Sequence, residues 1–255
     1  MVPEKDTMSL SIITVCFNSE KYIASAIESV ISQSYPNLEY IIIDGGSTDN
    51  TIEIINSYSG KISKFISEPD KGIYDAMNKG IMHATGDIIG ILNSDDYYKD
   101  NQVLDKIVQL FRNHKTNSVF ADIDYVDPKR ENKIIRKWVS GPYKPHSFKK
   151  GWHPAHPGFF VKKNIFNSFG DYDLSYKVAA DFELMLRFIE KHKISNYYLP
   201  ESIINMRLGG ESNKSLRNIF KGNKECFRAF KKNDLQVSVL YPLFRLLPKI
   251  NQFFR

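Results

Sequence analysis

The sequence predicts an α/β protein with a mainly parallel sheet that is flanked by helices. Within the first 100 residues, four short runs rich in β-branched residues alternate with three stretches whose apolar residues recur at helical spacing. The runs are apolar almost throughout, as in strands that helices cover on both faces. Because strands that alternate with helices are joined by right-handed crossovers, we expect the four runs to lie parallel in one sheet.

The chain of 255 residues has the length of one large domain with a small appendage. A change in charge marks the boundary between the two. Residues 213–255 contain ten lysines and arginines but only two acidic residues, which gives this segment a net charge of +8. The net charge of the whole chain is +6. We therefore expect a folded domain over residues 1–212 and a basic, amphipathic helical tail over residues 213–255.

In the first half, strands are predicted at residues 10–17, 38–43, 62–67 and 88–92. Apolar residues at helical spacing predict one helix in each of the three gaps between these strands. The residues are Tyr22, Ile23, Ala26, Ile27, Val30 and Ile31 in the first helix; Ile52, Ile55 and Tyr58 in the second; and Ile73, Ala76, Met77, Ile81 and Ala84 in the third.

In the second half of the sequence, the predicted helices and strands alternate less regularly. A loop over residues 140–158 is dense in proline, glycine, aromatic residues and histidine, and loops of this length often carry function. Asp122 and Asp124 are expected on an exposed sheet edge. The predicted elements are a helix after Asp100, strands at 118–123, 133–139 and 159–161, a helix at 179–188, and strands at 194–199 and 203–208.

Each of the first four strands ends in a polar side chain. Asn18, Asp44 and Glu68 follow the first three strands, and Asp95 and Asp96 follow the fourth. In open α/β sheets, ligands bind beyond the carboxyl ends of the strands, near the point where the strand order switches. Any one of these residues could cap a helix or form a turn, but acids at the same end of three successive strands favour a ligand site.

The adjacent Asp95 and Asp96 indicate a divalent cation. Hard ions such as Mg²⁺ and Mn²⁺ take carboxylate oxygens together with the phosphates of a substrate. The alternative is a solvated acidic loop that caps the next helix. The chain has neither of two glycine-rich phosphate-binding motifs, G-x-G-x-x-G after the first strand or G-x-x-x-x-G-K-[ST]. A metal ion and basic side chains would therefore have to neutralise the charge of a bound phosphate.

Four blocks of sequence carry a resemblance to a known family. They are residues 14–18 of the first strand, DGGSTD at 44–49, EPDKG with YDAMNKG between 68 and 80, and NSDD at 93–96. Together, about the first 100 residues resemble the nucleotide-binding half of family 2 glycosyltransferases, which are inverting enzymes with a GT-A fold. Asn93 differs from the first aspartate of the D-x-D found in many members.

The resemblance implies that the first half binds a nucleotide, usually uridine, and that a divalent cation, Mn²⁺ or Mg²⁺, is held by Asp95 and Asp96. Residues 1–100 would then be the nucleotide-binding part of the domain, and residues 101–212 the acceptor and catalytic part. The residues expected to bind the nucleotide sugar are Thr14, Asn18, Asp44, Glu68, Lys71, Asp75, Asn78, Asn93, Ser94, Asp95, His156 and Arg207.

The resemblance also implies a general base in the second half. Family members carry an acidic pair near the start of a helix; Asp181 matches the second acid, and Ala180 replaces the first. From the residues alone, an acid in the first turn of a helix is unremarkable. Asp181 is the expected catalytic base, with Glu183 in reserve.

Two further segments gain an expected role from the resemblance. His156 matches a histidine near the diphosphate or the acceptor, whereas a zinc site with His153 would lack a third ligand. Arg207 and Ser212 lie in a segment that closes over the diphosphate in the family.

The basic tail also carries many aromatic residues, a composition that suits an anionic membrane surface. Packing on the domain is one alternative; a nucleic-acid patch is the other, although the sequence has no recognised nucleic-acid module. The chain shows no secretory signal, and no apolar run reaches the ~18 residues of a membrane span. We expect a cytoplasmic protein at the inner face of the cell membrane.

The expected function is the inverting transfer of a hexose from a UDP-sugar to a hydroxyl of a lipid-diphosphate-linked saccharide, as in O-antigen or capsule assembly. One alternative is a sugar nucleotidyltransferase, which would place a glycine-rich basic loop after the first strand, where residues 15–19 supply none. The other is a non-catalytic, membrane-peripheral UDP-binding protein of the same fold, suggested by Asn93 and Ala180.

Overall fold

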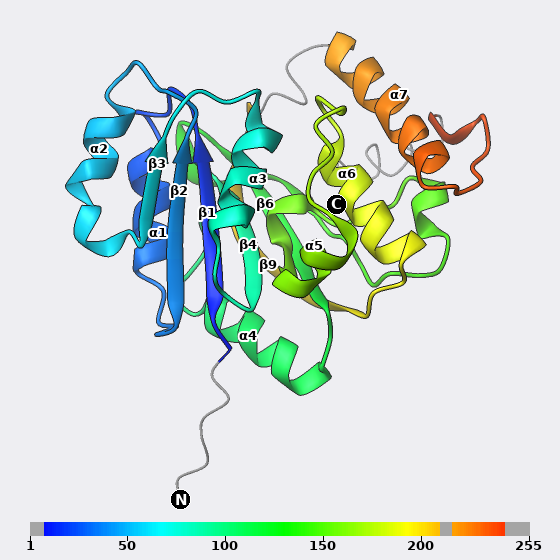
Figure 1. Cartoon of the computed structure of the whole chain (residues 1–255), viewed down its shortest axis with the longest axis horizontal. Helices are drawn as coiled ribbons and strands as arrows, with labels where there is room; N and C mark the ends of the chain where they lie inside the picture. Colours follow the sequence, from blue (N-terminus) through cyan, green and yellow to red (C-terminus); the bar gives the residue numbers. More distant parts are fainter. Residues whose placement is uncertain (1–7, 210–215, 243–255) are drawn as a thin grey trace, which may run out of the picture.

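The computed structural model describes residues 8–209 and 216–242. The described strands form one nine-stranded sheet in the order β3-β2-β1-β4-β8-β6-β9-β5, with β7 paired to β6 (Figure 1). The strands are β1 (Leu10–Cys16), β2 (Leu38–Asp44), β3 (Lys64–Ser67), β4 (Ile88–Asn93), β5 (Asp96–Tyr98), β6 (Ser118–Asp127), β7 (Arg130–Trp138), β8 (Phe159–Lys162) and β9 (Asn196–Arg207). The α-helices are α1 (Ile23–Ile31), α2 (Thr51–Ser57), α3 (Ile73–His83), α4 (Val103–His114), α5 (Lys163–Phe169), α6 (Ala180–Met185) and α7 (Leu216–Lys232).

The four strands predicted in the first half are confirmed, and they run parallel with β1 between β2 and β4. Ile12 and Cys16 of β1 point into one hydrophobic core, whereas Ile13 and Val15 point into the other. This alternation is the two-residue period of a strand that is buried on both faces, and it explains why the run is apolar throughout.

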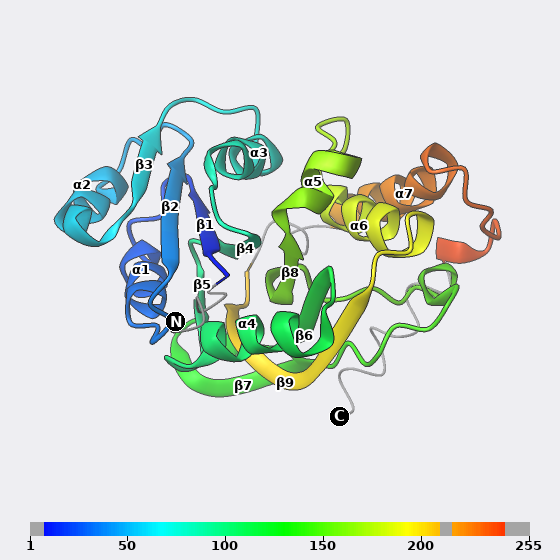
Figure 2. The same cartoon turned by 60° about the horizontal axis from the view of Figure 1, so that its bottom comes forward.

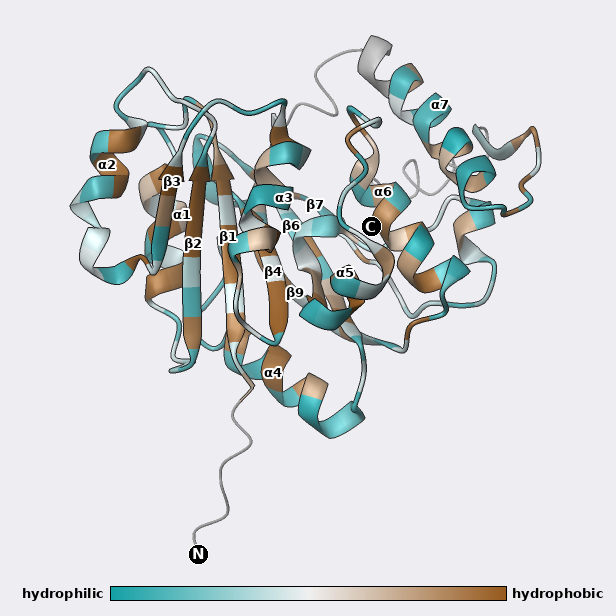
Figure 3. Cartoon of the chain, in the orientation of Figure 1, coloured by the Kyte–Doolittle hydropathy of each residue, from teal (hydrophilic) through white to brown (hydrophobic). Residues whose placement is uncertain are grey.

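Helices cover both faces of the sheet. Buried residues of α1, α2 and α4 belong to one core, and those of α3, α5, α6 and α7 belong to the other. Figure 2 shows two halves side by side, one with β1 to β4 and α1 to α3, the other with β6, β8, β9 and α5 to α7. The central strands are the most hydrophobic elements (Figure 3).

β8 joins the two halves, because it lies antiparallel between β4 and β6. A short 3₁₀ turn, His156–Gly158, leads directly into β8, as the sequence predicted. Gly158 packs tightly there: a Cβ at this position would lie 2.9 Å from the carbonyl oxygen of Ala121. The turn therefore fixes His156 next to the end of β4.

One continuous strand, β9, replaces the two strands expected between residues 194 and 208. It pairs with β6 along its length, and the pairing skips from Leu199 to Ser202. Pro200 lies in the skipped pair, and because proline has no N–H to donate, a bulge at this point lets the strand continue.

Asp122 and Asp124 are buried, so their expected position on an exposed edge is wrong. The cause is that β6 is an interior strand with neighbours on both sides. Asp122 accepts hydrogen bonds from the Tyr198 hydroxyl and the Ser140 N–H, and Asp124 forms an ion pair with Lys99 at 2.7 Å.

α7 belongs to the predicted tail and packs on the domain beside α6 (Figures 1 and 2). Cys226, Ala229 and Phe230 are buried in the core with Phe182 of α6, whereas Phe220 is exposed. Ser212 and the last part of the tail lie outside the described residues. Within residues 8–209 and 216–242, no helix is both long and apolar enough to span a membrane.

Candidate active site

The carboxyl ends of β1, β2 and β4 meet at one edge of the sheet. The strand order switches at β1: the chain runs outward from β1 to β2 and β3, and then returns to place β4 on the other side of β1. Such a switch in strand order is where open α/β sheets bind ligands. The loops at this edge carry Asn18, Asp44, Asn93 and Asp95, as the sequence predicted.

Asp44 is buried and shapes the loop that follows β2. Its carboxylate accepts hydrogen bonds from the N–H groups of Gly46 at 3.1 Å and Ser47 at 2.9 Å, and from the hydroxyls of Ser47 and Ser67. Burial alone would raise the pKa of Asp44, but these hydrogen bonds outweigh burial and hold the pKa below its ordinary value. The charged carboxylate therefore stabilises the loop, and its contact with a nucleotide stays a prediction.

Three loops are tied together at this edge. Asn18 adopts a left-handed conformation with φ of 47°, and its side-chain oxygen accepts the N–H of Thr48 at 2.9 Å. The N–H of Asn18 donates to the Ser47 hydroxyl at 2.8 Å. The hydroxyl oxygens of Ser19 and Ser94 lie 2.8 Å apart, which links the loops after β1 and β4.

The adjacent Asp95 and Asp96 have different surroundings. Asp95 is partly exposed, whereas Asp96 is fully buried as the first residue of β5. Burial, together with the charge of Asp95, raises the pKa of Asp96 well above its ordinary value. Asn93 Nδ2 lies 3.3 Å from Asp96 Oδ2, and Asp96 Oδ1 has no hydrogen-bond partner in the described part of the chain. Of the pair, only Asp95 is accessible to a ligand.

Arg207 supports the loop that carries Asp95. Its Nη1 donates to the carbonyl oxygen of Asp95 at 2.8 Å, and its Nε donates to Glu131 at 2.8 Å. The guanidinium lies between the rings of Tyr22 and Tyr97, 4.7 and 4.5 Å from their centroids, and the residue is 3% exposed. The donors of Arg207 are thus directed at Asp95, Glu131 and Ser25, and its expected contact with a diphosphate stays a prediction.

A chain of polar side chains connects the end of β4 with the start of α6. Asn93 Nδ2 lies 3.3 Å from His156 Nε2, and His156 Nδ1 lies 3.5 Å from Asp181 Oδ2. Burial lowers the pKa of His156, and the charges of Asp181 and Asp95 offset only part of this effect. We infer the neutral tautomer with the proton on Nδ1, since Nε2 can then accept from the Asn93 amide while Nδ1 faces the carboxylate.

Tyr74 approaches Asp181 from the first half of the chain. Its hydroxyl donates to the carbonyl oxygen of Val178 at 2.9 Å and lies 3.4 Å from Asp181 Oδ1. Burial and the charge of Asp181 raise the pKa of Tyr74, so the phenol keeps its proton and can donate. The sequence analysis gave Tyr74 no role, although it lies in the YDAMNKG block that carries the resemblance.

Asn78 of α3 also joins the two halves. Its amide nitrogen donates to the carbonyl oxygen of Tyr172 at 2.8 Å, and its amide oxygen accepts the N–H of Tyr172 at 2.9 Å. Both polar ends of Asn78 are thus used to fix the loop before α6. Asn78 holds the site together at this point, and its contact with a nucleotide stays a prediction.

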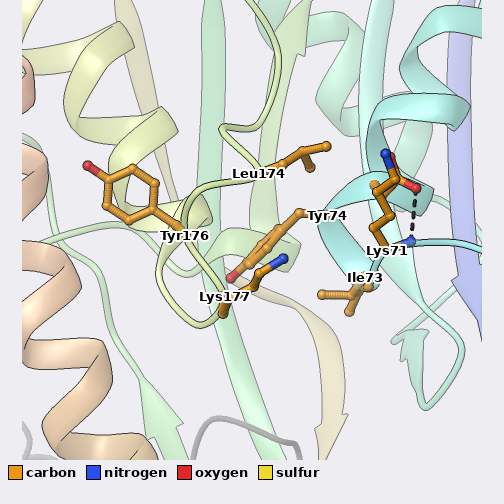
Figure 4. Close-up of a pocket in the computed structure, with 8 residues that line it drawn as sticks. Lys71, Ile73, Tyr74, Leu174, Tyr176 and Lys177 are labelled. Carbon is orange, nitrogen blue, oxygen red and sulfur yellow. Dashed lines mark hydrogen bonds between the residues drawn. The ribbon is translucent and has the colours of Figure 1, made fainter.

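A small pocket opens next to Tyr74 (Figure 4). Figure 4 shows Lys71 and Ile73 on one side of the Tyr74 ring, and Lys177 and Tyr176 on the other. The residues that line it are Lys71, Gly72, Ile73, Tyr74, Asp75, Leu174, Tyr176 and Lys177. Because Tyr74 also contacts Asp181, this pocket borders the candidate site, and it brings the predicted Lys71 and Asp75 to its rim.

Three predicted residues do not face the site. Thr14 is buried inside β1 and accepts the Tyr40 hydroxyl at 3.0 Å, which corrects its expected contact with a nucleotide. Glu68 forms a surface ion pair with Lys79 at 2.7 Å. The reserve base Glu183 is buried in an ion pair with Arg187, so Asp181 is the acid of α6 that lies in the site.

The residues at the end of β4 fit a divalent cation that is shared with a diphosphate. Such ions commonly take one or two protein carboxylates and complete their shell with phosphate oxygens and water. Asp95 supplies an accessible carboxylate, a hard oxygen donor of the type that Mg²⁺ and Mn²⁺ prefer. No group of three or more His, Cys, Asp or Glu side chains that could hold a metal ion occurs in residues 8–209 and 216–242, so the donor's phosphates would have to complete the shell.

Comparisons with known proteins agree with this geometry. The sequence profile of the family described as Glycosyl transferase family 2 matches residues 11–199. A PGL/p-HBAD biosynthesis glycosyltransferase of Mycobacterium bovis is 26% identical over 207 residues, which are 80% of this chain and 78% of that protein. An uncharacterized glycosyltransferase of Mycobacterium tuberculosis is 32% identical over 184 residues, 70% of this chain and 68% of that protein.

Solved structures share the fold at lower identity. Residues 1–349 of S. aureus TarS, in complex with UDP-GlcNAc, have a TM-score of 0.73 and 17% identity, over 97% of this chain and 73% of that 1–349 chain. The mannosyltransferase PcManGT from Pyrobaculum calidifontis, in complex with GDP-Man and Mn²⁺, has a TM-score of 0.67 and 16% identity, over 95% of this chain and 69% of that protein. These likenesses extend over nearly the whole chain, both halves of the sheet included.

Proposed function

Because this chain belongs to glycosyl transferase family 2 and has the GT-A fold, we propose that it transfers a hexose from a UDP-sugar to an acceptor hydroxyl with inversion at the anomeric carbon. The observation that carries the proposal is the position of Asp181, whose partly exposed carboxylate lies between His156 and Tyr74. Asp181 is thus held next to the end of β4, where Asp95 is accessible.

In this proposal, Asp181 is the general base. Its carboxylate accepts the proton of the acceptor hydroxyl while that oxygen attacks the anomeric carbon from the face opposite the leaving UDP. His156 remains neutral and turns Nδ1 toward Asp181, and the Tyr74 hydroxyl, which donates to the carbonyl oxygen of Val178, lies 3.4 Å from the other carboxylate oxygen. Both neighbours hold the carboxylate in one orientation, as a positioned base requires.

We assign the divalent cation, Mn²⁺ or Mg²⁺, to Asp95 rather than to both aspartates. When bound, such an ion neutralises the negative charge that develops on a leaving diphosphate. Asp96 is fully buried as the first residue of β5, whereas the partly exposed Asp95 can reach an ion that arrives from solvent. The Mn²⁺ in the PcManGT complex supports this proposal.

UDP is the proposed donor nucleotide, with residues 1–100 as the nucleotide-binding part and residues 101–212 as the acceptor part. The TarS complex with UDP-GlcNAc supports a uridine nucleotide, whereas the PcManGT complex contains GDP-Man. The acceptor that we propose is a lipid-diphosphate-linked saccharide of cell-surface polysaccharide synthesis, at the inner face of the cell membrane.

The outer face of α7 supports a peripheral contact with an anionic membrane. Phe220, Lys221, Lys224 and Lys231 are exposed there, while the opposite face of the helix is buried. Cations near lipid headgroups and a ring at the membrane boundary are typical of helices that lie on a membrane surface. Within this proposal, α7 both packs on the domain and contacts lipid.

Calorimetric titration of UDP, with and without Mn²⁺, tests the donor assignment. We expect metal-dependent binding of UDP that is tighter than binding of GDP, followed by release of UDP from a UDP-hexose when a lipid-linked acceptor is added. Tighter binding of GDP would change the donor class. Binding of UDP without turnover of any UDP-hexose would favour a non-catalytic protein of the same fold.

A further inference from the structure

The helix that carries Asp181 is held by a carboxylate from α7. Glu225 is 7% exposed, and its two carboxylate oxygens accept three successive backbone N–H groups of the segment before α6. The N–H of Lys177 lies 3.1 Å from both oxygens, that of Val178 lies 2.8 Å from Oε2, and that of Ala179 lies 3.0 Å from Oε2.

These N–H groups precede a helix that has no cap of its own. The first N–H groups of a helix lack partners within it, and a side chain at the N-cap usually accepts one of them. The N-cap of α6 is Ala179, which has no side chain able to do so. Glu225, from a helix 46 residues away in the chain, instead accepts the N–H of Ala179 itself and those of the two residues before it, and its negative charge also suits the positive end of the helix dipole.

A second contact from α7 holds the next turn of α6. Asn233, just beyond the last residue of α7, donates to Glu183 Oε1 at 2.9 Å, and Arg187 donates to both oxygens of the same carboxylate. The held positions are therefore Ala179 and Glu183, and Asp181 lies midway between them. Neither Glu225 nor Asn233 touches the loops at the ends of β1 and β2 in the contacts described.

We propose that Glu225 is a positioning residue for the proposed base: its carboxylate fixes the backbone at residues 177–179 so that Asp181 stays within reach of His156 and Tyr74. The inference rests on the proposed function of Asp181. The carbonyl of Val178 accepts the Tyr74 hydroxyl while its N–H donates to Glu225, so one peptide segment connects α7 with α3 through the site. α7 is then part of the active-site structure, in addition to any contact it makes with lipid.

Apolar packing is the competing explanation for the place of α6. Cys226, Ala229 and Phe230 are buried against this part of the domain and would hold the helix without Glu225. Glu225→Gln separates the two explanations, because it keeps the size of the side chain and leaves the apolar contacts in place. It removes the charge and turns one carboxylate oxygen into an N–H₂ group that cannot accept. Glu53→Gln is the matched control, since it makes the same change at an exposed position of α2, away from the site.

The first measurement is hydrogen–deuterium exchange of the full-length wild type, Glu225→Gln and Glu53→Gln. We expect faster exchange in Glu225→Gln confined to the peptide that covers residues 176–184, and no change over these residues in Glu53→Gln. The second measurement is a comparison of UDP affinity with turnover of UDP-hexose. Because small displacements of a catalytic group reduce rate steeply, we expect turnover in Glu225→Gln to fall about 10- to 100-fold while the Kd for UDP changes less than about twofold.

Unchanged turnover in Glu225→Gln, or unchanged exchange over residues 176–184, would overturn the proposal. A parallel loss of UDP binding and turnover would also overturn it, because that result indicates damage to the whole domain. If the wild type turns over no UDP-hexose, the proposed function fails instead. The exchange experiment then still decides whether Glu225 fixes the segment that leads into α6.

Discussion

His156 Nδ1 lies 3.5 Å from Asp181 Oδ2, and the opposite ring nitrogen lies 3.3 Å from Asn93 at the end of β4. His156 lies in the turn before β8 and Asp181 lies in the first turn of α6, and together they join the nucleotide side of the sheet to the helix that carries the proposed base. A neutral imidazole can serve this purpose because it donates at one nitrogen and accepts at the other. The position of Asp181 relative to a donor thus depends on His156.

Replacement of His156 by phenylalanine should lower turnover without a comparable loss of donor binding. The ring volume is retained, but both nitrogen contacts are lost, so we expect UDP release from a UDP-hexose to fall about 10- to 100-fold. His153→Phe is a control in the same loop. A large rise in the Kd for UDP with an unchanged kcat would instead assign His156 to donor binding.

The partly buried, neutral His156 should make stability depend on pH. Its pKa is below 6.5 in the folded protein and about 6.5 in the unfolded chain, so below this pH the unfolded state binds the additional proton. The stability that neutral His156 contributes is therefore present above about pH 6.5 and is lost as the pH falls toward the lowered folded pKa. We expect the Tm of the wild type to fall more than that of His156→Phe between about pH 8 and pH 5.5. Equal slopes for the two proteins would contradict a lowered pKa.

The two adjacent aspartates should respond differently to replacement by asparagine. Asp95→Asn removes the accessible carboxylate, and we expect the enhancement of UDP binding by Mn²⁺ to disappear. Asp96→Asn changes a side chain that is fully buried, so the enhancement should be retained in large part. Titration of UDP with and without Mn²⁺ into both variants makes the comparison. Equal losses would show that both carboxylates contact the ion.

Gly90 in the middle of β4 should tolerate no side chain. A Cβ at this position would lie 2.5 Å from Cε1 of Phe160 and 2.9 Å from Cδ1 of Ile12, both in a densely packed core. Overpacking of this type commonly costs about 1–3 kcal/mol in the free energy of unfolding, so we expect Gly90→Ala to be destabilised by this amount in urea unfolding. Gly60→Ala is a control, since nothing lies within 4 Å of a Cβ there. Equal stability of the two variants would contradict the close approach of β4 and β8.

The sequence predicted the first half of the fold well because its strands are buried on both faces. In β1, β2 and β4, nearly every residue lies in one of the two cores, so the apolar runs mark the strands directly. β9 carries a weaker signal, since it contains Pro200 and many partly exposed residues, and only its pairing with β6 holds it in one piece. β5 has three residues and was not predicted, because a run so short has no period to detect.

The composition of the candidate site was predicted more successfully than its arrangement. Asn93, His156 and Asp181 were all named from the sequence, and the structure brings them together. The buried environments of Thr14, Asp96 and Arg207 could not be predicted, because burial depends on which loops cover these residues. The role proposed for Glu225 depends on a contact between α7 and the segment before α6, and no local pattern in the sequence indicates it.

The central claim is that Asp181 is the general base of a transferase that uses a UDP-sugar. The most direct test compares Asp181→Asn with the wild type for UDP affinity and for turnover of a UDP-hexose in the presence of Mn²⁺. Because a positioned base commonly contributes about 10²- to 10⁴-fold to rate, we predict a loss of turnover in this range with the Kd for UDP unchanged. An Asp181→Asn variant with full activity would contradict the claim.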